Sequence, residues 1–437
     1  MQLRNVVIVD GCRSAFGRGG RGSLVGTRLD DTGAKIIRAL LDRNPKVTDA
    51  MIEDIGLGNV GGAGELAGIG ADTVAHLAGL PHEVSAFDTN RQCGSSMETL
   101  HRVAQSIQVG ATDCGIAIGI ERMGRGLGGG RPPFEKNRIT EFNPQRMKMS
   151  EAQRNLAPDH FQNFSVAFPD YILDAPPVTS MTQTAQNVAE VYNLSREEMD
   201  EFSVLSHKKA AEAYEKGIYK DEVIPLEIEL PVFDDQGNWV ADERGKTVVF
   251  DRDECIRAGT NIETLSQLKT VNGIVSYGNK ELVITAGNSC PTNDGISAVL
   301  LMSEEKAAEL GLEPLARIVG YGISGVKPQV MGLGPVPSTK KALKHAGLTP
   351  DQIDRVEFNE AFAAQVIPSC KELGIPVDRV NVNGGSIAIG HPLGATGARL
   401  VLTVAHELRR SNSKYGLGTQ CIGAGMGIST IIENMSA

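Results

Sequence analysis

Residues 114–122 read CGIAIGIER, and residues 426–434, near the other end of the chain, read MGISTIIEN. Both segments are apolar, with glycine at the second position and glutamate at the eighth. Short apolar runs of this kind are typical of buried strands. The pair is compatible with a duplicated fold, although one pair does not establish a duplication.

Strand-like and helix-like stretches alternate around both segments, which predicts an α/β fold with covered strands. In the first 122 residues the pattern predicts strands at 6–10, 55–60, 86–89 and 115–121, and helices at 31–43, 70–78 and 95–108. In the last third it predicts strands at 356–359, 418–421 and 427–433, and helices at 360–373 and 394–410.

The middle of the chain differs in kind. Residues 123–183 are rich in glycine, proline, arginine and methionine and show little periodicity, which predicts a long irregular excursion. A helix is predicted at 200–217. Irregular insertions of this length are usually functional or surface elaborations, so we expect this region to lie outside the main sheet.

Length and charge limit the classes of protein to consider. The 437 residues correspond to roughly three domain-sized units. The net charge of −10 argues against nucleic acid as the main partner, because phosphate binding needs a basic face. The sequence has no signal-peptide pattern and no run of about 18 apolar residues, so we expect no integral membrane segment and a cytoplasmic location.

Cysteine usage supports the same compartment. The chain has seven cysteines, an odd number with no CxxC pair. We therefore expect reduced thiols, and neither a disulfide framework nor a zinc site. The cysteines are Cys12, Cys93, Cys114, Cys255, Cys290, Cys370 and Cys421.

The segment NRQCGSSMETL at 90–100 holds the first candidate for chemistry. Cys93 lies between a predicted strand and a predicted helix, with Ser95 or Ser96 as the expected cap. The positive end of a helix favours a thiolate, which an ordinary thiol with a pKa of about 8.5 rarely forms at neutral pH. Taken alone, Cys93 fits a small buried apolar residue at least as well as a nucleophile.

The second candidate is His391, in NVNGGSIAIGHPLGATGARL at 381–400. Glycines surround it, and glycine lets backbone pass close to a ligand or lets a helix pack tightly. The loop alone fits a structural histidine as well as a functional one. The glycines are Gly384, Gly385, Gly390, Gly394 and Gly397.

Two further motifs lie at predicted strand ends. In CIGAGMG at 421–427, Cys421 precedes a glycine-rich turn whose N–H groups are unobstructed, the elements of an oxyanion hole beside an acid/base. Taken alone, this motif fits a structural cysteine beside a bulge better than a functional one. In EFNEAFA at 357–363, Asn359 lies at a strand-to-helix junction, where it is either functional or a helix cap.

Together the four motifs resemble the signature segments of the thiolase family. The likeness covers nearly the whole chain, because SHKKAAEAYEKGIYKDEVIPLEI (206–228), TAGNSCPTND (285–294) and VMGLGPVPSTKKAL (330–343) also resemble thiolase segments in the expected order. Ketoacyl and hydroxymethylglutaryl-CoA synthases use other residues in these roles. The non-enzymatic alternative is a thiolase-like scaffold that binds only CoA or another subunit, although such scaffolds commonly lose a catalytic residue.

The resemblance implies a thiolase-like α/β fold, with two similar βαβαβαββ halves in a layered αβαβα arrangement and an inserted loop domain. The N-terminal half would comprise residues 1–122 and 294–314. The CoA-binding loop domain would comprise residues 123–293, and the C-terminal half residues 315–437.

The implied activity is that of an acyl-CoA:acetyl-CoA C-acyltransferase, which condenses acetyl-CoA or cleaves 3-ketoacyl-CoA by thiolysis. Cys93 would carry the acyl group as a thioester, His391 would activate it, and Cys421 would be the second acid/base. One oxyanion site would be His391 with a water held by Asn359, and the other the N–H groups of Cys93 and Gly423. No metal and no cofactor besides the substrate coenzyme A would be required, because the thioester supplies the acidity and the leaving group.

Substrate-binding residues also follow from the resemblance. Arg257 matches an arginine near the adenine and phosphate end of CoA, and Cys290 matches a serine that touches the pantetheine in many thiolases. The residues that match the thioester pocket and its surroundings are Met181, Met331, Phe362 and Gly390.

Departures from the family pattern leave acyl-chain length and physiological direction open. Ser180 stands where many bacterial acetoacetyl-CoA thiolases have histidine, and the segment after Glu121 is longer than in the shortest thiolases. A longer loop also occurs in thiolases of the β-oxidation multienzyme complex, so such a partner is an open alternative. The family implies a homodimer or homotetramer, with Ala86, Phe87 and Met97 near the two-fold interface.

Overall fold

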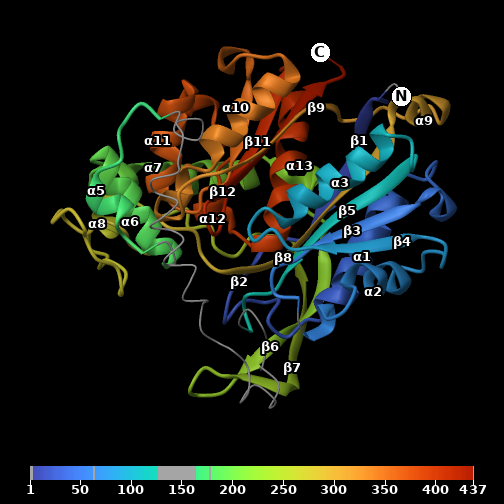
Figure 1. Cartoon of the computed structure of the whole chain (residues 1–437). Helices are drawn as coiled ribbons and strands as arrows, with labels where there is room; N and C mark the ends of the chain where they lie inside the picture. The colour runs from blue at the N-terminus through green and yellow to red at the C-terminus, as the bar shows by residue number, and fades with distance from the viewer. Residues whose placement is uncertain (1–2, 63, 126–163, 177–178, 437) are drawn as a thin grey trace, which may run out of the picture.

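The computed structural model describes residues 3–62, 64–125, 164–176 and 179–436 (Figure 1). A 10-stranded sheet has the order β10-β11-β12-β9-β1-β8-β5-β3-β4, with β2 paired to β8. The strands are β1 (Val6–Arg13), β2 (Gly17–Arg18), β3 (Asp54–Gly58), β4 (Ser85–Thr89), β5 (Cys114–Glu121), β8 (Asn293–Ser303), β9 (Ala316–Gly325), β10 (Arg355–Phe358), β11 (Tyr415–Ile422) and β12 (Met426–Asn434).

One strand order occurs twice in this sheet. The runs β3-β5-β8-β1 and β10-β11-β12-β9 each begin with a parallel pair and continue with two antiparallel pairs. In the first run β4 extends the edge in parallel, and in the second a parallel bridge between Val356 and Val380 takes that place. A short antiparallel pairing of β1 with β9 joins the two runs.

The two similar sequence segments do not mark equivalent strands. Residues 114–122 form β5, whose counterpart in the second run is β11, whereas residues 426–434 form β12, whose counterpart is β8. The predicted duplication of the fold is confirmed, but the two segments that suggested it are not equivalent strands of the two halves. Their likeness reflects the shared demand of central strands for apolar side chains on both faces.

Helices complete five layers, as expected from the thiolase resemblance (Figure 1). Two helices pack against each other between the two runs of strands, and two further pairs lie on the outer sides. The central helices are α3 (Ser95–Gln108) and α13 (Leu393–Ser411); the outer ones are α1 (Leu29–Asp42) and α2 (Gly70–Leu77), and α10 (Pro335–Ala346) and α11 (Ala363–Leu373).

Alternating side chains of each central strand separate the layers. In β1, Val7 and Val9 join the apolar cluster under α1, whereas Val6 and Ile8 join the cluster around α3 and α13. This period-2 alternation of two apolar faces explains why the strand is a continuous apolar run in the sequence.

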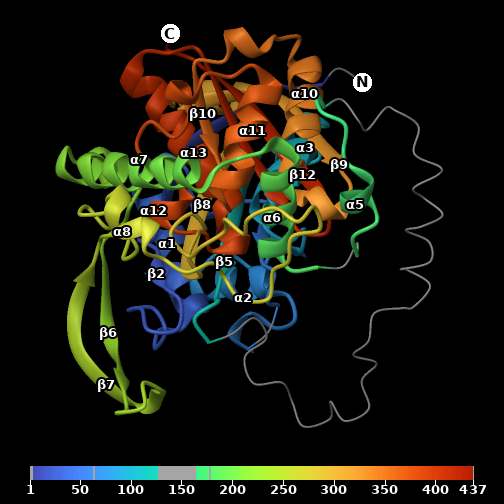
Figure 2. The same cartoon turned by 90° about the vertical axis from the view of Figure 1, so that its left-hand side faces the viewer.

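The middle of the chain lies beside this layered body. Figure 2 shows the β6–β7 hairpin projecting from it, an element that the sequence analysis did not predict. The predicted helix at 200–217 is α7, which begins four residues earlier, and most of the predicted excursion at 123–183 lies outside the described residues. These elements are α5 (Asp170–Leu173), α6 (Met181–Tyr192), α7 (Arg196–Glu215), β6 (Leu226–Phe233), β7 (Trp239–Phe250) and α8 (Ile262–Ser266), followed later in the chain by α9 (Glu304–Glu309) and α12 (Ser386–Ile389).

The proposed domain boundaries at 122/123, 293/294 and 314/315 stay predictions. Within the described residues, no helix combines the length and apolar character needed to cross a membrane.

Candidate active site

Cys93 lies in a tight turn between β4 and α3. Gln92 adopts a φ of 48°, which is uncommon for a residue with a side chain. The turn is held by Ser95, whose hydroxyl accepts from the Arg91 N–H (3.0 Å) and donates to the Gln92 carbonyl (2.6 Å). The expectation that Ser95 or Ser96 caps the helix is wrong, since the N-cap is Gly94 and no side chain caps it.

Two backbone N–H groups, those of Cys93 and Gly423, act on the thiol of the half-buried Cys93. They lower the pKa of the thiol, but burial raises it to about 11, and Glu121 adds to the rise. The expectation that the helix terminus makes Cys93 acidic is therefore wrong for the free enzyme, because loss of solvent outweighs the N–H groups. Cys93 is a thiol at neutral pH and needs a base to ionise.

His391 lies two residues before the start of α13 and has one defined tautomer. Its Nδ1 lies 2.7 Å from the Thr396 hydroxyl, which donates its own proton to the Pro392 carbonyl (2.9 Å). Nδ1 must therefore carry the hydrogen, which leaves a lone pair on Nε2, 3.3 Å from the Asn359 amide nitrogen. Burial, reinforced by Arg399, lowers the His391 pKa to about 3, so the ring is neutral at working pH.

The Asn359 amide is oriented by a buried chain of donors. The Ser386 hydroxyl donates to Asn359 Oδ1 (2.7 Å) and accepts from Arg399 Nη2 (2.8 Å). Arg399 also pairs with Glu357 at 2.5 Å. Because Oδ1 is occupied, Nδ2 must face His391.

Asn359 is not the helix cap that its position in the sequence allowed. β10 ends at Phe358, and α11 begins only at Ala363, three residues later than predicted. The N-cap is Phe362, whose backbone is extended (φ −150°, ψ 144°). The intervening residues form a loop that leaves the Asn359 side chain free for the hydrogen bonds of the site.

Cys421 lies at the end of β11 and is fully buried. Its sulfur is 3.1 Å from Gln365 Oε1, a contact that the sequence analysis missed. Burial raises the pKa of the Cys421 thiol well above its usual range, and Cys93 adds to the effect. Gln420 Nε2 donates to the Cys93 carbonyl (2.9 Å) and ties this strand to the nucleophile turn.

The close packing of α3 and α13 brings the nucleophile turn beside the histidine loop. A Cβ on Gly397 would lie 2.4 Å from the Met97 backbone nitrogen, so only glycine fits there. The Ala398 N–H donates to the Ser96 hydroxyl at 2.9 Å. Met97 is fully buried in this contact, and the predicted position of its helix near a subunit interface stays a prediction.

The backbone conformation of Gly390 determines how the chain enters the loop that carries His391. Its φ is +121°, and a Cβ there would lie 2.6 Å from the Asn293 side chain. Asn293 Oδ1 accepts from the His391 N–H (2.9 Å), and its Nδ2 donates to the Gly17 carbonyl (3.0 Å). Asn293 had no predicted role, although it lies in the quoted segment 285–294.

Known proteins agree with this geometry. Residues 6–305 match the family described as "Thiolase, N-terminal domain", and residues 312–434 match "Thiolase, C-terminal domain". The chain belongs to the thiolase family. It is 40% identical over 441 residues to the β-ketoadipyl-CoA thiolase of Escherichia coli, which covers 99% of this chain and 100% of that protein.

Two further comparisons place this thiolase among acyltransferases. It is 39% identical over 434 residues to the 3-ketoacyl-CoA thiolase of Vibrio vulnificus (strain CMCP6), which covers 99% of this chain and 100% of that protein. The crystal structure of the Bacillus anthracis acetyl-CoA acetyltransferase matches with a TM-score of 0.80 at 33% identity, over 99% of this chain and 100% of that one. This thiolase is an acyltransferase that makes or cleaves 3-ketoacyl-CoA.

The predicted acyl pocket of the thiolase is partly assembled. Cys290, Met331 and Phe362 belong to one apolar cluster that also contains Cys421. Met181 is not brought into this cluster. It is the first residue of α6 and is 37% exposed.

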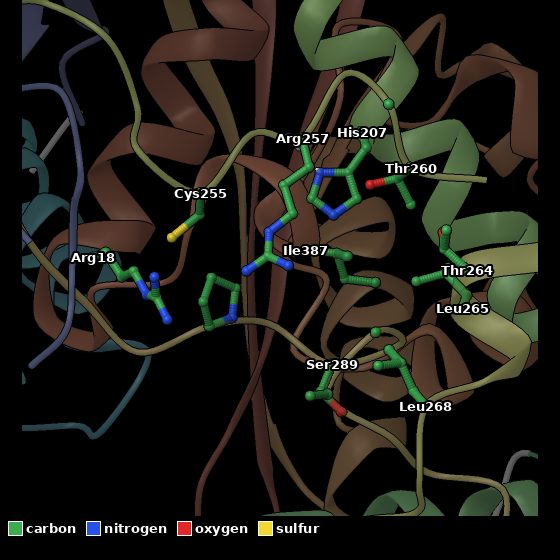
Figure 3. A pocket seen from close by; sticks show the side chains of 14 residues that line it. Arg18, His207, Cys255, Arg257, Thr260, Thr264, Leu265, Leu268, Ser289 and Ile387 are labelled. Atoms are coloured by element: carbon green, nitrogen blue, oxygen red, sulfur yellow. Dashed lines mark hydrogen bonds between the residues drawn. The ribbon is translucent and has the colours of Figure 1, made fainter. Parts of the chain in front are cut away.

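A cavity of about 390 Å³ beside the acyl pocket contains Arg257. Figure 3 shows the side chains of Arg257 and Arg18 pointing toward each other across it. None of the described residues that line it is acidic, so the two guanidinium groups suit an anionic ligand. Arg18 was missed because it lies on β2, far from the loop domain in sequence.

The described residues contain no group of three or more His, Cys, Asp or Glu side chains arranged to hold a metal ion. That the enzyme works without a metal or cofactor stays a prediction.

Proposed function

We propose that this thiolase transfers acyl groups through a thioester on Cys93. The observation that carries the proposal is the hydrogen bond from Gln420 to the Cys93 carbonyl, which holds the nucleophile turn beside the end of β11, where Cys421 and the N–H of Gly423 lie. The N–H groups of Cys93 and Gly423 suit the oxygen of a thioester formed on the Cys93 sulfur. His391, neutral and with its lone pair on Nε2, is the base that takes the Cys93 proton.

In thiolysis, the Cys93 sulfur attacks the C3 carbonyl of a 3-ketoacyl-CoA, and the C2–C3 bond breaks. The departing acetyl-CoA enolate takes a proton from Cys421, and free CoA then attacks the acyl group on Cys93. Condensation is the reverse. Once Nε2 of His391 carries the proton from Cys93 it becomes a donor, and with a water held by Asn359 it forms the second oxyanion site. The thioester supplies the acidity and the leaving group, so we propose that no metal or redox cofactor takes part.

The test is covalent labelling. Acetyl-CoA incubated with the wild type should add one acetyl mass to the peptide that contains Cys93, and the Cys93→Ala variant should gain none. Cys370→Ala is the matched control, because Cys370 is buried in the outer layer away from the site. A label on Cys421, or no label on folded wild type, would overturn the assignment.

We further propose that coenzyme A lies over the loop domain, with its phosphate-bearing end at Arg257. The cavity there supports this placement, because it offers two cations and no acidic side chain among its described lining. The acyl-thioester end would lie against Cys290, Met331 and Phe362, with Gly390 and Met181 nearby.

The physiological substrate is a 3-ketoacyl-CoA of fatty acid metabolism in our proposal, and the enzyme acts in β-oxidation. The relative named 3-ketoacyl-CoA thiolase supports this choice, whereas the one named β-ketoadipyl-CoA thiolase makes a dicarboxylic acyl group the second candidate. A panel of straight-chain and carboxylate-terminated 3-ketoacyl-CoA substrates, assayed in both directions, separates them. A preference of more than about tenfold for the carboxylate-terminated substrate would reject the first choice.

We propose a cytoplasmic homodimer or homotetramer, with a β-oxidation multienzyme partner as an alternative assembly. Support comes from β4, which ends the sheet and carries the half-buried side chains of Ala86 and Phe87. An unpaired edge strand is suited to pairing across a two-fold axis. Light scattering should give two or four times the 46.5 kDa chain mass, and a fully active monomer would refute the assembly.

A further inference from the structure

Gln365 bridges two residues of the proposed reaction. It lies in the first turn of α11 and is fully buried. Its Oε1 is 3.1 Å from the Cys421 sulfur, and its Nε2 donates to the backbone carbonyl of Asn359 at 3.2 Å.

The direction of the Gln365 amide is fixed by chemistry. The Asn359 carbonyl only accepts hydrogen bonds, so the Gln365 NH₂ group must face it. The reversed amide would place two oxygens against each other in a buried site. Oε1 must therefore face the Cys421 sulfur, and an oxygen acceptor binds that sulfur only while it carries its hydrogen.

The Gln365 side chain also has little freedom to move away. A Cβ on Gly332 would lie 2.8 Å from the Gln365 Cβ, so the glycine backbone packs closely against the base of this side chain. The Asn359 N–H is itself held by the Thr419 carbonyl at 2.9 Å, which fixes the position of the carbonyl that Gln365 binds. Through Asn359, Gln365 is thus anchored to β11, the strand that also carries Cys421.

We propose that Gln365 is a positioning residue that holds Cys421 as a thiol with its S–H directed to Oε1, so that the resting enzyme presents Cys421 as an acid. This inference rests on the proposed role of Cys421. In thiolysis, the Cys421 proton moves to the enolate carbon as the C2–C3 bond breaks, and the thiolate left behind takes the proton of the incoming CoA thiol. In condensation, the proton moves to the departing CoA sulfur, and the thiolate then removes the α-proton of the second acetyl-CoA. Both directions therefore start from the thiol.

The first test uses Gln365→Met, which keeps the length of the side chain and removes both amide groups. The Cys421 S–H stretching band, isolated as the difference between wild-type and Cys421→Ser infrared spectra, should lie at lower frequency in wild type than in the Gln365→Met background. Condensation should slow by about 10- to 100-fold, and acetylation of Cys93 should slow less, because the CoA sulfur can leave as a thiolate whereas the α-carbon needs its proton transferred. An unshifted band, or equal loss of both steps, would overturn the proposal.

Gln365→Glu keeps the proposal testable if the methionine variant fails to fold. A neutral carboxylic acid can donate to the Asn359 carbonyl and accept from Cys421, whereas a carboxylate cannot donate. Condensation by Gln365→Glu should therefore approach wild type at low pH and fall as the pH rises, relative to wild type at each pH. A constant ratio across the pH range would reject the role of Gln365.

Cys421→Ser separates this failure from failure of the proposed function. If Cys421→Ser loses acetylation and condensation equally, the assignment of Cys421 is wrong. If Cys421→Ser separates the two steps and Gln365→Met does not, only the inference about Gln365 fails.

Discussion

Replacing Thr396 with valine should expose how the structure sets the tautomer of His391. The Thr396 hydroxyl accepts the Nδ1 hydrogen at 2.7 Å and is itself committed to the Pro392 carbonyl. Both side chains are buried, with exposed fractions of 0% for Thr396 and 2% for His391, so water is a poor substitute for the lost acceptor. Valine has nearly the same volume but cannot accept a hydrogen bond.

The size of the effect follows from the unsatisfied donor. A buried N–H without a partner costs about 1–3 kcal/mol. The tautomer with hydrogen on Nε2 does not avoid this cost, because its Nε2–H would face the Asn359 amide nitrogen, whose orientation Ser386 fixes. At about 1.4 kcal/mol per factor of ten, the turnover of Thr396→Val should fall by about 10- to 100-fold.

The assay is thiolysis of acetoacetyl-CoA at saturating substrate, with Thr396→Ser as the control that keeps the acceptor. Thr396→Ser should stay within about threefold of wild type. Nitrogen NMR of the imidazole should report hydrogen on Nδ1 in all three proteins, with the Nδ1 resonance of Thr396→Val shifted by the loss of its acceptor. A folded Thr396→Val enzyme that is as fast as Thr396→Ser would refute the claim that this hydrogen bond prepares the base.

Three further outcomes are expected. Arg257→Ala and Arg18→Ala should each raise the Michaelis constant for acetoacetyl-CoA by about tenfold, with little change in saturated turnover. Neither variant should change the Michaelis constant for a pantetheine thioester, because that substrate lacks the nucleotide. A fall in turnover without a change in the Michaelis constant would remove the two arginines from the binding site. Cys421→Ser should depress condensation by about 10²–10⁴-fold while acetylation of Cys93 persists, which mass spectrometry and product assay measure separately. Burial lowers the pKa of His101 to about 3, so below pH 6.5 the unfolded chain binds a proton that the folded protein does not. The free energy of unfolding should therefore fall, relative to His101→Gln, by about 1.4 kcal/mol per pH unit from pH 6 to 4, and parallel curves in chemical denaturation would contradict this.

The elements that the sequence predicted well are those whose burial leaves a periodic pattern. The helix predicted at 95–108 has those bounds, because its apolar positions recur at helical spacing on the face that packs against α13. The β6–β7 hairpin was missed because most of its side chains are at least partly exposed, and the alternation of buried and exposed residues is confined to the first half of β6. The stretch between β10 and α11 was predicted as helix because its residues are buried, and a buried loop can have the same composition as the first turn of a helix.

The motifs predicted which residues come together in the site, but not their protonation states. Cys93, Gly423 and Cys421 converge because β11 and the start of α3 are tied together, as the Gln420 hydrogen bond shows. Nothing in the local sequence around Cys93 indicates that burial outweighs the N–H groups and leaves a thiol with a pKa of about 11. That balance depends on residues more than 300 positions away.

The directions of the hydrogen bonds in the site can be read only from the three-dimensional structure. Thr396, Ser386 and Gln365 each read as ordinary buried polar residues, and each acquires a role because its second hydrogen bond is already committed. A hydroxyl or amide with both ends occupied can transmit only one orientation to its neighbour. The site therefore reaches its resting state, with a neutral base at His391 and a protonated acid at Cys421, through partners whose roles the motifs do not reveal.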